Sequence, residues 1–253
     1  QQGVGTRYRL PGPGHSLSAA PSTIQGFWRI GRGCLAAVCV LLAVCWSAPW
    51  PFLAASDLPR IQFTPHMLDV AEKKHGPLAR QRLEAWQKVA WSSRERPEIE
   101  KLRQVNDFFN RIPFVSDAEH WRVNDYWATP TEMLMTNGGD CEDYAIAKYF
   151  TLLMLGVPME KLKITYVKAR NPQWTPPSQA HMVLTYYADN KAIPLVLDNL
   201  IPEIRPASQR SDLTPVYAFN GAGLWLAQQR GLGKTVEGGS NNIGFWRDLI
   251  ARM

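Results

Sequence analysis

The first predicted elements are three amphipathic helices. They cover residues 65–75, 77–91 and 97–111. Each begins with a proline in its first turn, where the missing N–H group costs no intrahelical hydrogen bond. In the third segment, the apolar residues at helical spacing are Ile99, Leu102, Val105 and Phe109. Residues with this spacing share one face of a helix, so we expect that face to pack into the core.

A fourth helix follows, and then the hydrophobic period changes. Residues 141–155 predict a longer helix that ends at Gly156 in a left-handed conformation. One broad stripe of this helix consists of Tyr144, Ala145, Lys148, Tyr149, Leu152 and Leu153. Segments 162–168, 181–187 and 193–197 are rich in the residues typical of strands. This order predicts an α+β fold in which the 141–155 helix packs on an antiparallel sheet.

The second and third predicted strands form a hairpin that pairs two polar residues. Between them, residues 188–191 are a turn-forming cluster. If Asp189 and Asn190 are the two loop residues, paired residues have numbers that sum to 379, and His181 lies opposite Asp198. Side chains of opposite residues point to one face, with Cβ atoms about 4.5–5.5 Å apart.

An uncharged apolar segment lies near the beginning of the chain. It covers residues 34–46, follows Arg29 and Arg32, and precedes a group of small residues. This order predicts a signal peptide at 29–56 and export to the periplasm. The apolar segment is short for a membrane-spanning helix, and prolines interrupt its extension. An uncleaved membrane anchor is therefore the less favoured alternative.

The rest of the chain is predicted to be one domain with a flexible segment at each end. Residues 1–28 are rich in Gly, Pro and Ser, which indicates a disordered or start-site extension. Residues 57–230 have the length of a single domain that buries its own core. Residues 231–253 begin with a glycine-rich stretch and are predicted to be a flexible C-terminal tail. The amphipathic end of this tail, residues 245–253, is expected to pack on the domain.

Charge excludes one class of partner, and the cysteine count singles out one residue. The chain has a formal net charge of +6, but four arginines and no acidic residue lie in its first 56 positions, which leaves +2 for the remainder. This balance argues against a phosphate-binding surface and hence against nucleic acid as a partner.

Cys34, Cys39 and Cys45 lie in the predicted signal peptide, so Cys141 is the one cysteine of the domain.

Cys141 lies where a thiol is most easily activated. It follows a glycine turn and begins the 141–155 helix, whose N–H groups and dipole favour a thiolate. A buried, inert thiol is the alternative. His181 or Asp198 alone would more often be structural. Together with Cys141 they supply a base, an orienting carboxylate and a nucleophile, the set that acyl transfer through a thioester requires.

Three acidic residues surround this nucleophile, namely Asp140, Glu142 and Asp143. Their charges oppose thiolate formation unless a cation neutralises them. Oxygen ligands at a tight turn suit Ca²⁺. Asp140 is equally well placed as the N-cap of the helix, with Asp143 at the capping-box position. The residues themselves leave both interpretations open, a calcium site and a helix cap.

Motifs around all three candidate catalytic residues resemble one known family. They are residues 139–145 (Gly-Asp-Cys-Glu-Asp-Tyr-Ala), 179–184 and 195–200, with further similarity at 127–132, 212–215 and 219–220. On these motifs, residues 63–226 resemble the bacterial transglutaminase-like cysteine proteinases, the LapG-type periplasmic proteases. Because separate motifs agree, the resemblance is more specific than a bare order of Cys, His and Asp.

This resemblance implies a papain-like, transglutaminase-core fold and a calcium-dependent cysteine endopeptidase with Cys141, His181 and Asp198 as its triad. It assigns Ca²⁺ to the three acidic positions around the nucleophile. The implied substrate is the N-terminal region of a large surface adhesin, whose cleavage releases cells from a biofilm. The implied partner is an inner-membrane cyclic di-GMP receptor whose periplasmic domain sequesters the protease.

Two questions stay open from the sequence. The N–H of Cys141 is the first candidate oxyanion donor, and Trp121 and Trp127 are candidates for the second, although both are as well suited to a core. The reaction is the other question. The same triad in the wider superfamily performs transamidation, with an amine in place of water. A non-catalytic, calcium-binding interaction module is a further alternative, against which the intact triad argues.

Overall fold

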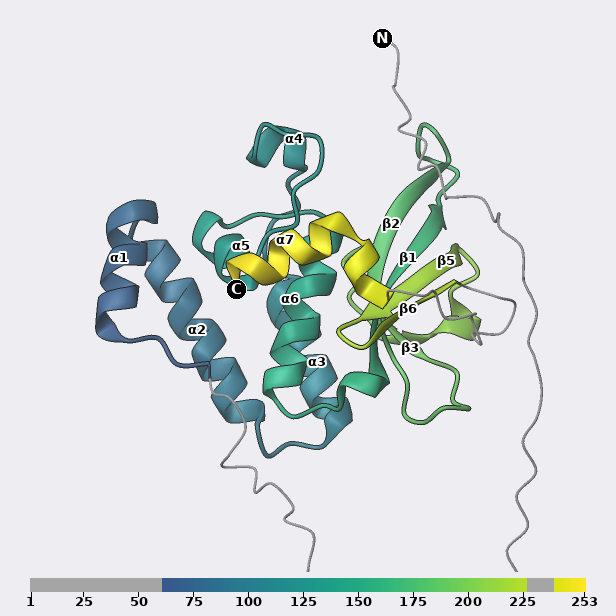
Figure 1. Cartoon of the computed structure of the whole chain (residues 1–253), viewed down its shortest axis with the longest axis horizontal. Helices are drawn as coiled ribbons and strands as arrows, with labels where there is room; N and C mark the ends of the chain where they lie inside the picture. The colour runs from purple at the N-terminus through teal and green to yellow at the C-terminus, as the bar shows by residue number, and fades with distance from the viewer. Residues whose placement is uncertain (1–60, 227–238) are drawn as a thin grey trace, which may run out of the picture. The chain divides into compact units, whose positions relative to one another are not determined.

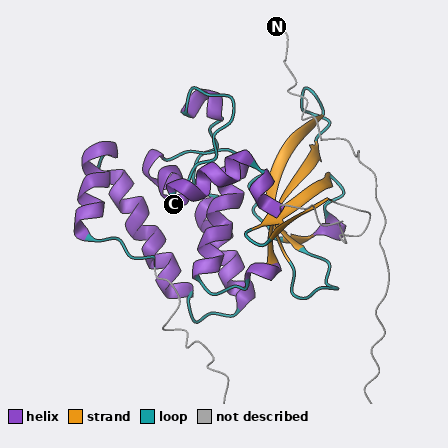
Figure 2. Ribbon diagram, in the orientation of Figure 1, coloured by secondary structure: helices purple, strands orange, loops and turns teal. Residues whose placement is uncertain are grey.

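The computed structural model describes residues 61–226 and 239–253 of the chain. The predicted signal peptide at 29–56, the extension at 1–28 and residues 231–238 of the predicted tail lie outside these residues. Within the described part, every helix is too short or too polar to cross a membrane. Most helices gather on one side of a single sheet (Figure 2).

The three predicted N-terminal helices are confirmed. They are α1 (Pro65–His75), α2 (Pro77–Ser93) and α3 (Glu98–Phe109). Pro97 is the N-cap of α3 and lies just before its first residue. In α3, the side chains of Leu102, Val105 and Phe109 are fully buried as predicted. The prediction is wrong for Ile99, which is 39% exposed because it lies in the first turn, at the N-terminal end of the helix.

The predicted central helix is confirmed as α6 (Cys141–Met154), and Gly156 follows it with a φ of 79°. It contacts α3 and α5 (Pro130–Thr136) as well as two strands of the sheet, and Figure 1 shows it between the other helices and the strands. Because α6 is enclosed, burial extends beyond the predicted stripe to Ile146 and Ala147. A helix packed on all sides holds its first residue, Cys141, in a defined position.

The sheet has six antiparallel strands in the order β4-β3-β2-β1-β5-β6. The strands are β1 (Leu162–Arg170), β2 (Ser178–Tyr186), β3 (Leu195–Leu197), β4 (Arg205–Pro206), β5 (Leu213–Asn220) and β6 (Gly223–Leu226). The first three correspond to the predicted strands. The last three go beyond the prediction, since β4 has only two residues and Pro215 interrupts the strand pattern of β5. The predicted α+β class is confirmed.

The predicted pairing of β2 with β3 is wrong by two residues. Leu184 lies opposite Leu197, so paired residues have numbers that sum to 381 and not to 379. Residues 187–194 join the two strands, in place of a two-residue turn. A shift of two residues keeps each side chain on its predicted face, because side chains alternate with a period of two. His181 and Asp198 therefore share a face as diagonal neighbours, which side chains of their length can still bridge.

Short elements complete the described chain. They are α4 (Asp117–His120), α7 (Gly244–Arg252) and the 3₁₀ turns η2 (Met159–Lys161), η3 (Ala207–Gln209) and η4 (Gly239–Asn242). The prediction of a flexible tail is wrong for residues 239–253, because Trp246 and Leu249 of α7 are buried in the core. The amphipathic end packs on the domain, as predicted. Its Phe245 ring stacks on the buried Trp127, with the ring centroids 5.7 Å apart.

Candidate active site

The turn before α6 brings the candidate nucleophile into place. Asp140 is the N-cap of α6 in an extended conformation, and Cys141 is the first helical residue. A β-bridge between Phe114 and Gly139 holds the preceding segment. A Cβ atom at position 139 would lie 2.7 Å from Oδ2 of Asp143, closer than non-bonded atoms approach. The turn therefore requires glycine there, because any side chain would push against Asp143 in the first turn of α6.

The thiol of Cys141 contacts both an acidic residue and the sheet. Sγ donates to Oε2 of Glu142 at 3.0 Å, and the backbone N–H of Met182 in β2 donates to the sulfur. Burial raises the pKa of the thiol well above its ordinary value, and the charges of Glu142 and Asp140 raise it further. The contact with Met182 places the sulfur beside the residue that follows His181 in β2.

His181 and Asp198 form a buried pair. Nε2 of His181 lies 2.8 Å from Oδ1 of Asp198. Oδ1 also accepts the N–H of Leu200 at 3.0 Å, and Oδ2 accepts from Nη2 of Arg210 at 2.7 Å. Burial by itself would raise the pKa of Asp198, but these hydrogen bonds and the adjacent imidazole hold it well below its usual value. The carboxylate is therefore ionised, and it engages Nε2 of the ring, which leaves Nδ1 for proton transfer.

Arg210 is a member of this site that the sequence pattern does not reveal. Its side chain is 4% exposed and bridges Asp198 to Asp212, whose Oδ2 lies 2.7 Å from Nη2. It follows η3, in the connection between β4 and β5. The pairing of β3 with β4 and of β1 with β5 brings this connection next to Asp198. The family-like motif at 212–215 is the nearest signal in the sequence.

Replacing Arg210 by alanine is expected to lower the free energy of unfolding by about 3–5 kcal/mol, because Asp198 then stays buried with one charged partner fewer. Urea denaturation measures this change. The lowered pKa of Asp198 means that its contribution is present above its unfolded pKa of about 3.9 and is lost at lower pH. The difference between Arg210→Ala and the unchanged chain should therefore shrink as the pH falls below that value.

Arg205→Ala is the matched control for this measurement. It removes an arginine whose partner is the exposed Glu203, and such surface pairs contribute at most about 1 kcal/mol. An Arg210→Ala protein as stable as Arg205→Ala would show that Arg210 does not support the buried carboxylate.

A cluster of acidic side chains lies beside Cys141. Besides the three predicted residues, it contains Asp117 of α4 and Asp125 of the following loop. Single carboxylate oxygens of Asp117, Asp125 and Glu142 lie within 4.8 Å of one another, and the same is true of Asp117, Asp140 and Asp143. We call these five residues the acidic cluster. The sequence predicts the three members that adjoin the nucleophile, but no spacing links Asp117 or Asp125 to the helix.

The chemistry of the acidic cluster fits a hard cation. Burial raises the pKa of all five carboxyl groups, and repulsion from neighbouring carboxylates adds to it for every member except Asp117. The pKa of Asp140 is thereby raised to about 9 and that of Glu142 to about 7. The Oδ1 atoms of Asp117, Asp125 and Asp140 are buried and have no hydrogen-bond partner among the described residues. Oxygen donors that are buried, close together and without partners are suited to Ca²⁺.

Asp143 also has the capping role that the sequence allows. Its Oδ1 accepts the N–H of Ala128 at 2.7 Å, and its Oδ2 accepts the N–H of Asp140 at 3.2 Å. This fully buried side chain therefore ties the start of α6 to the loop before α5. The helix-cap and metal-site interpretations are compatible, since Asp143 holds the backbone while its neighbours present the oxygen atoms without partners.

The two tryptophans considered as oxyanion donors differ in their surroundings. The indole N–H of Trp127 donates to the side chain of Asp125, and its ring also stacks on Phe219 with the centroids 5.8 Å apart. Nε1 of Trp121 is buried and has no hydrogen-bond partner within the described chain. Of the two indole groups, that of Trp121 is therefore the one available to another acceptor.

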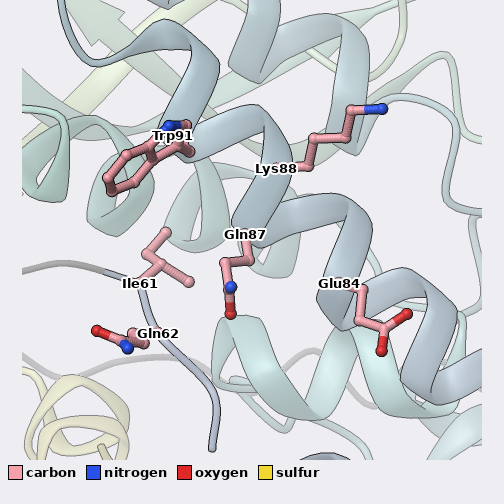
Figure 3. Close-up of a pocket in the computed structure, with 6 residues that line it drawn as sticks. All are labelled: Ile61, Gln62, Glu84, Gln87, Lys88 and Trp91. Carbon is pink, nitrogen blue, oxygen red and sulfur yellow. The ribbon is translucent and has the colours of Figure 1, made fainter.

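A cavity of about 400 Å³ lies along α2 and the segment before α1 (Figure 3). Its lining residues are Ile61, Gln62, Glu84, Gln87, Lys88 and Trp91. Neither the candidate triad nor the acidic cluster contributes to it. The candidate active site is therefore separate from this cavity.

The fold and these contacts define a transglutaminase-like α+β protein that carries a cysteine at the start of a buried helix and a His–Asp pair on the adjoining sheet. The sequence model of a family described as bacterial transglutaminase-like cysteine proteinase BTLCP matches residues 81–215. The chain belongs to this family. It is accordingly a transglutaminase-like cysteine protease.

Solved structures of LapG from Legionella pneumophila are similar to most of the chain. One is 38% identical with a TM-score of 0.62, and covers 77% of this chain and 98% of its own. LapG described as EGTA-treated is 39% identical with a TM-score of 0.64 and the same coverage. LapG described as calcium-bound is 38% identical with a TM-score of 0.63, and covers 77% of this chain and 99% of its own. A comparison with curated proteins gives no match.

Proposed function

We propose that the chain is a calcium-dependent periplasmic cysteine endopeptidase that cleaves the N-terminal region of a large surface adhesin, and so promotes detachment from a biofilm. One observation carries the catalytic part of this proposal. His181 hydrogen bonds to Asp198 at 2.8 Å, and the N–H of the next residue, Met182, contacts the sulfur of Cys141. These contacts support the assignment of a nucleophile, a base and an orienting carboxylate to one catalytic site.

The proposed reaction begins when Nδ1 of His181 takes the proton of the Cys141 thiol. The thiolate attacks the scissile carbonyl carbon, and the imidazolium returns the proton to the leaving amine as the C–N bond breaks. The resulting thioester is attacked by water that has given a proton to His181, which then restores the thiol. Asp198, held by Arg210 and Leu200, keeps the ring in orientation and stabilises its charged form.

The negative oxygen of the tetrahedral intermediates needs hydrogen-bond donors. We assign the first to the N–H of Cys141, because this group lies in the first turn of α6, where backbone N–H groups have no partner within the helix. The second candidate is Nε1 of Trp121, which is buried without a partner.

The proposed calcium site consists of Asp117, Asp125, Asp140 and Glu142, with Asp143 fixing the backbone around them. Its support is the set of oxygen atoms without partners, together with the calcium-bound and EGTA-treated forms in which LapG has been solved. Bound Ca²⁺ would supply positive charge that offsets these carboxylates. Two of these residues adjoin the nucleophile, because one carboxylate oxygen of Asp140 and one of Glu142 lie within 4.8 Å of the Cys141 sulfur.

The proposed compartment, substrate and partner rest on other grounds. Export to the periplasm is supported by the signal-peptide pattern at 29–56. The adhesin substrate and the inner-membrane cyclic di-GMP receptor as the sequestering partner are supported by the family resemblance. The net charge of +2 after the first 56 residues supports protein partners over nucleic acid.

Incubation with the N-terminal fragment of a candidate adhesin tests the reaction. We expect mass spectrometry to find two fragments whose masses sum to that of the substrate plus one water. An added small primary amine serves as the control for acyl acceptors. Incorporation of this amine, or cross-linked substrate, would identify a transamidase, whereas an intact substrate in the presence of Ca²⁺ would favour a non-catalytic interaction module.

A further inference from the structure

The loop of residues 125–129, between α4 and α5, forms one wall of the acidic cluster. Asp125 belongs to the cluster itself. The N–H of Tyr126 donates to Oδ2 of Asp117 at 2.6 Å, and the N–H of Ala128 donates to Oδ1 of Asp143 at 2.7 Å. The position of three carboxylates in the cluster therefore depends on the conformation of this loop.

The opposite side of the same loop is held by the C-terminal helix through Arg252. Nη1 of this residue donates to the hydroxyl of Tyr126 at 2.6 Å and pairs with Oε2 of Glu132 at 2.5 Å. Nη2 donates to the carbonyl of Trp127 at 2.5 Å. The guanidinium also lies 4.5 Å from the ring centroid of Tyr126. A single planar group thus engages two consecutive loop residues and the first turn of α5.

The helix that carries Arg252 is itself firmly packed. Trp246 is 3% exposed and stacks on Phe150 of α6 with the centroids 5.6 Å apart. Leu249 is fully buried. Figure 1 shows α7, drawn in yellow, running past α5 and α6 to the C-terminus. These contacts with the core fix the direction from which Arg252 reaches the 125–129 loop.

We propose that Arg252 is a positioning residue for the calcium site, and that docking of α7 sets how tightly the acidic cluster binds Ca²⁺. This inference rests on the calcium site of the proposed function. The physical reason is pre-organisation: a loop already held on its outer side loses less conformational freedom when its inner side binds an ion. The same coupling acts in reverse, so bound Ca²⁺ must stabilise the docking of α7.

Calorimetric titration of the full chain with CaCl₂ tests the proposal. We expect Arg252→Ala to bind Ca²⁺ about 10-fold or more weakly than the unchanged chain, the range found when groups that support metal ligands are removed. Arg247→Ala is the matched control, because it removes the same charge from an exposed position of the same helix. Its affinity should be unchanged. Arg252→Lys keeps the charge but loses the forked geometry, and should give an intermediate affinity.

Hydrogen exchange of the unchanged chain gives a second measurement that needs no variant. Addition of Ca²⁺ should slow amide exchange in residues 244–252, whose side chains lie outside the acidic cluster. Equal Ca²⁺ affinities for Arg252→Ala and Arg247→Ala would overturn the inference, and so would amide exchange in α7 that is unchanged by Ca²⁺. Neither result would contradict the calcium site itself. An unchanged chain that binds no Ca²⁺ would overturn both.

Discussion

Replacement of Cys141 by alanine is expected to abolish cleavage of the adhesin fragment, with a loss of at least about 10⁴-fold in kcat. The reason is that no other described residue offers a thiol, and the variant removes the atom that forms the thioester. The change is small, and within the described part of the chain the thiol's hydrogen-bond partners are Glu142 and the backbone of Met182. The fold should therefore be retained, as shown by an unchanged circular dichroism spectrum. Fragment formation is measured over time by electrophoresis.

The matched control replaces Cys34, Cys39 and Cys45 by alanine. These cysteines lie in the predicted signal peptide, so purified protein with these three changes should cleave at the normal rate. Iodoacetamide should inactivate the unchanged chain and the triple variant alike. Cleavage that persists in folded Cys141→Ala would refute the assignment of the nucleophile, whatever the fold.

Removal of calcium is the second change expected to have a large effect. EGTA should abolish cleavage, and added CaCl₂ should restore it, because without a cation the acidic cluster surrounds the nucleophile with carboxylates that no bound charge offsets. Ca²⁺ that binds the folded chain and not the unfolded chain should also stabilise the folded state. The expected increase in the free energy of unfolding is about 2.7 kcal/mol when Ca²⁺ is present at 100 times its Kd. Thermal unfolding with and without EGTA measures this difference.

Variants of α4 separate a specific site from a general effect of charge. Asp117→Asn removes a charge from the cluster without changing the shape of the side chain, and should weaken Ca²⁺ binding at least about tenfold. Glu119→Gln, on the exposed side of the same short helix, removes the same charge and should have no effect. If both variants keep full activity in the presence of EGTA, the metal proposal fails.

The relation between His181 and Asp198 shows what periodicity can predict and what it cannot. The alternation of strands predicts that both side chains share a face, and the structure joins them at 2.8 Å. The predicted register is nevertheless wrong, because the length of the β2–β3 connection depends on how residues 187–194 pack and not on the turn residues alone. An error of two residues leaves the face of each side chain unchanged.

The acidic cluster likewise contains members that the sequence predicts and members that it does not. Asp140, Glu142 and Asp143 can be recognised because they adjoin Cys141 in the chain, and a helix start brings such neighbours together. Asp117 and Asp125 belong to a short helix and a loop without a hydrophobic period. Their place in the cluster depends on contacts of the 125–129 loop with Asp143 and with Arg252, which lies more than a hundred residues further along.

The sequence by itself determined the first three helices, the buried helix that begins at Cys141, the α+β class and the family. These features depend on short-range periodicity, helix-end residues and motifs of neighbouring residues, all of which can be read locally. Tertiary structure alone decided the strand register, the support of Asp198 by Arg210, the complete acidic cluster and the docking of α7. Each of these joins side chains from distant segments, and only the packing of the whole core determines which of them meet.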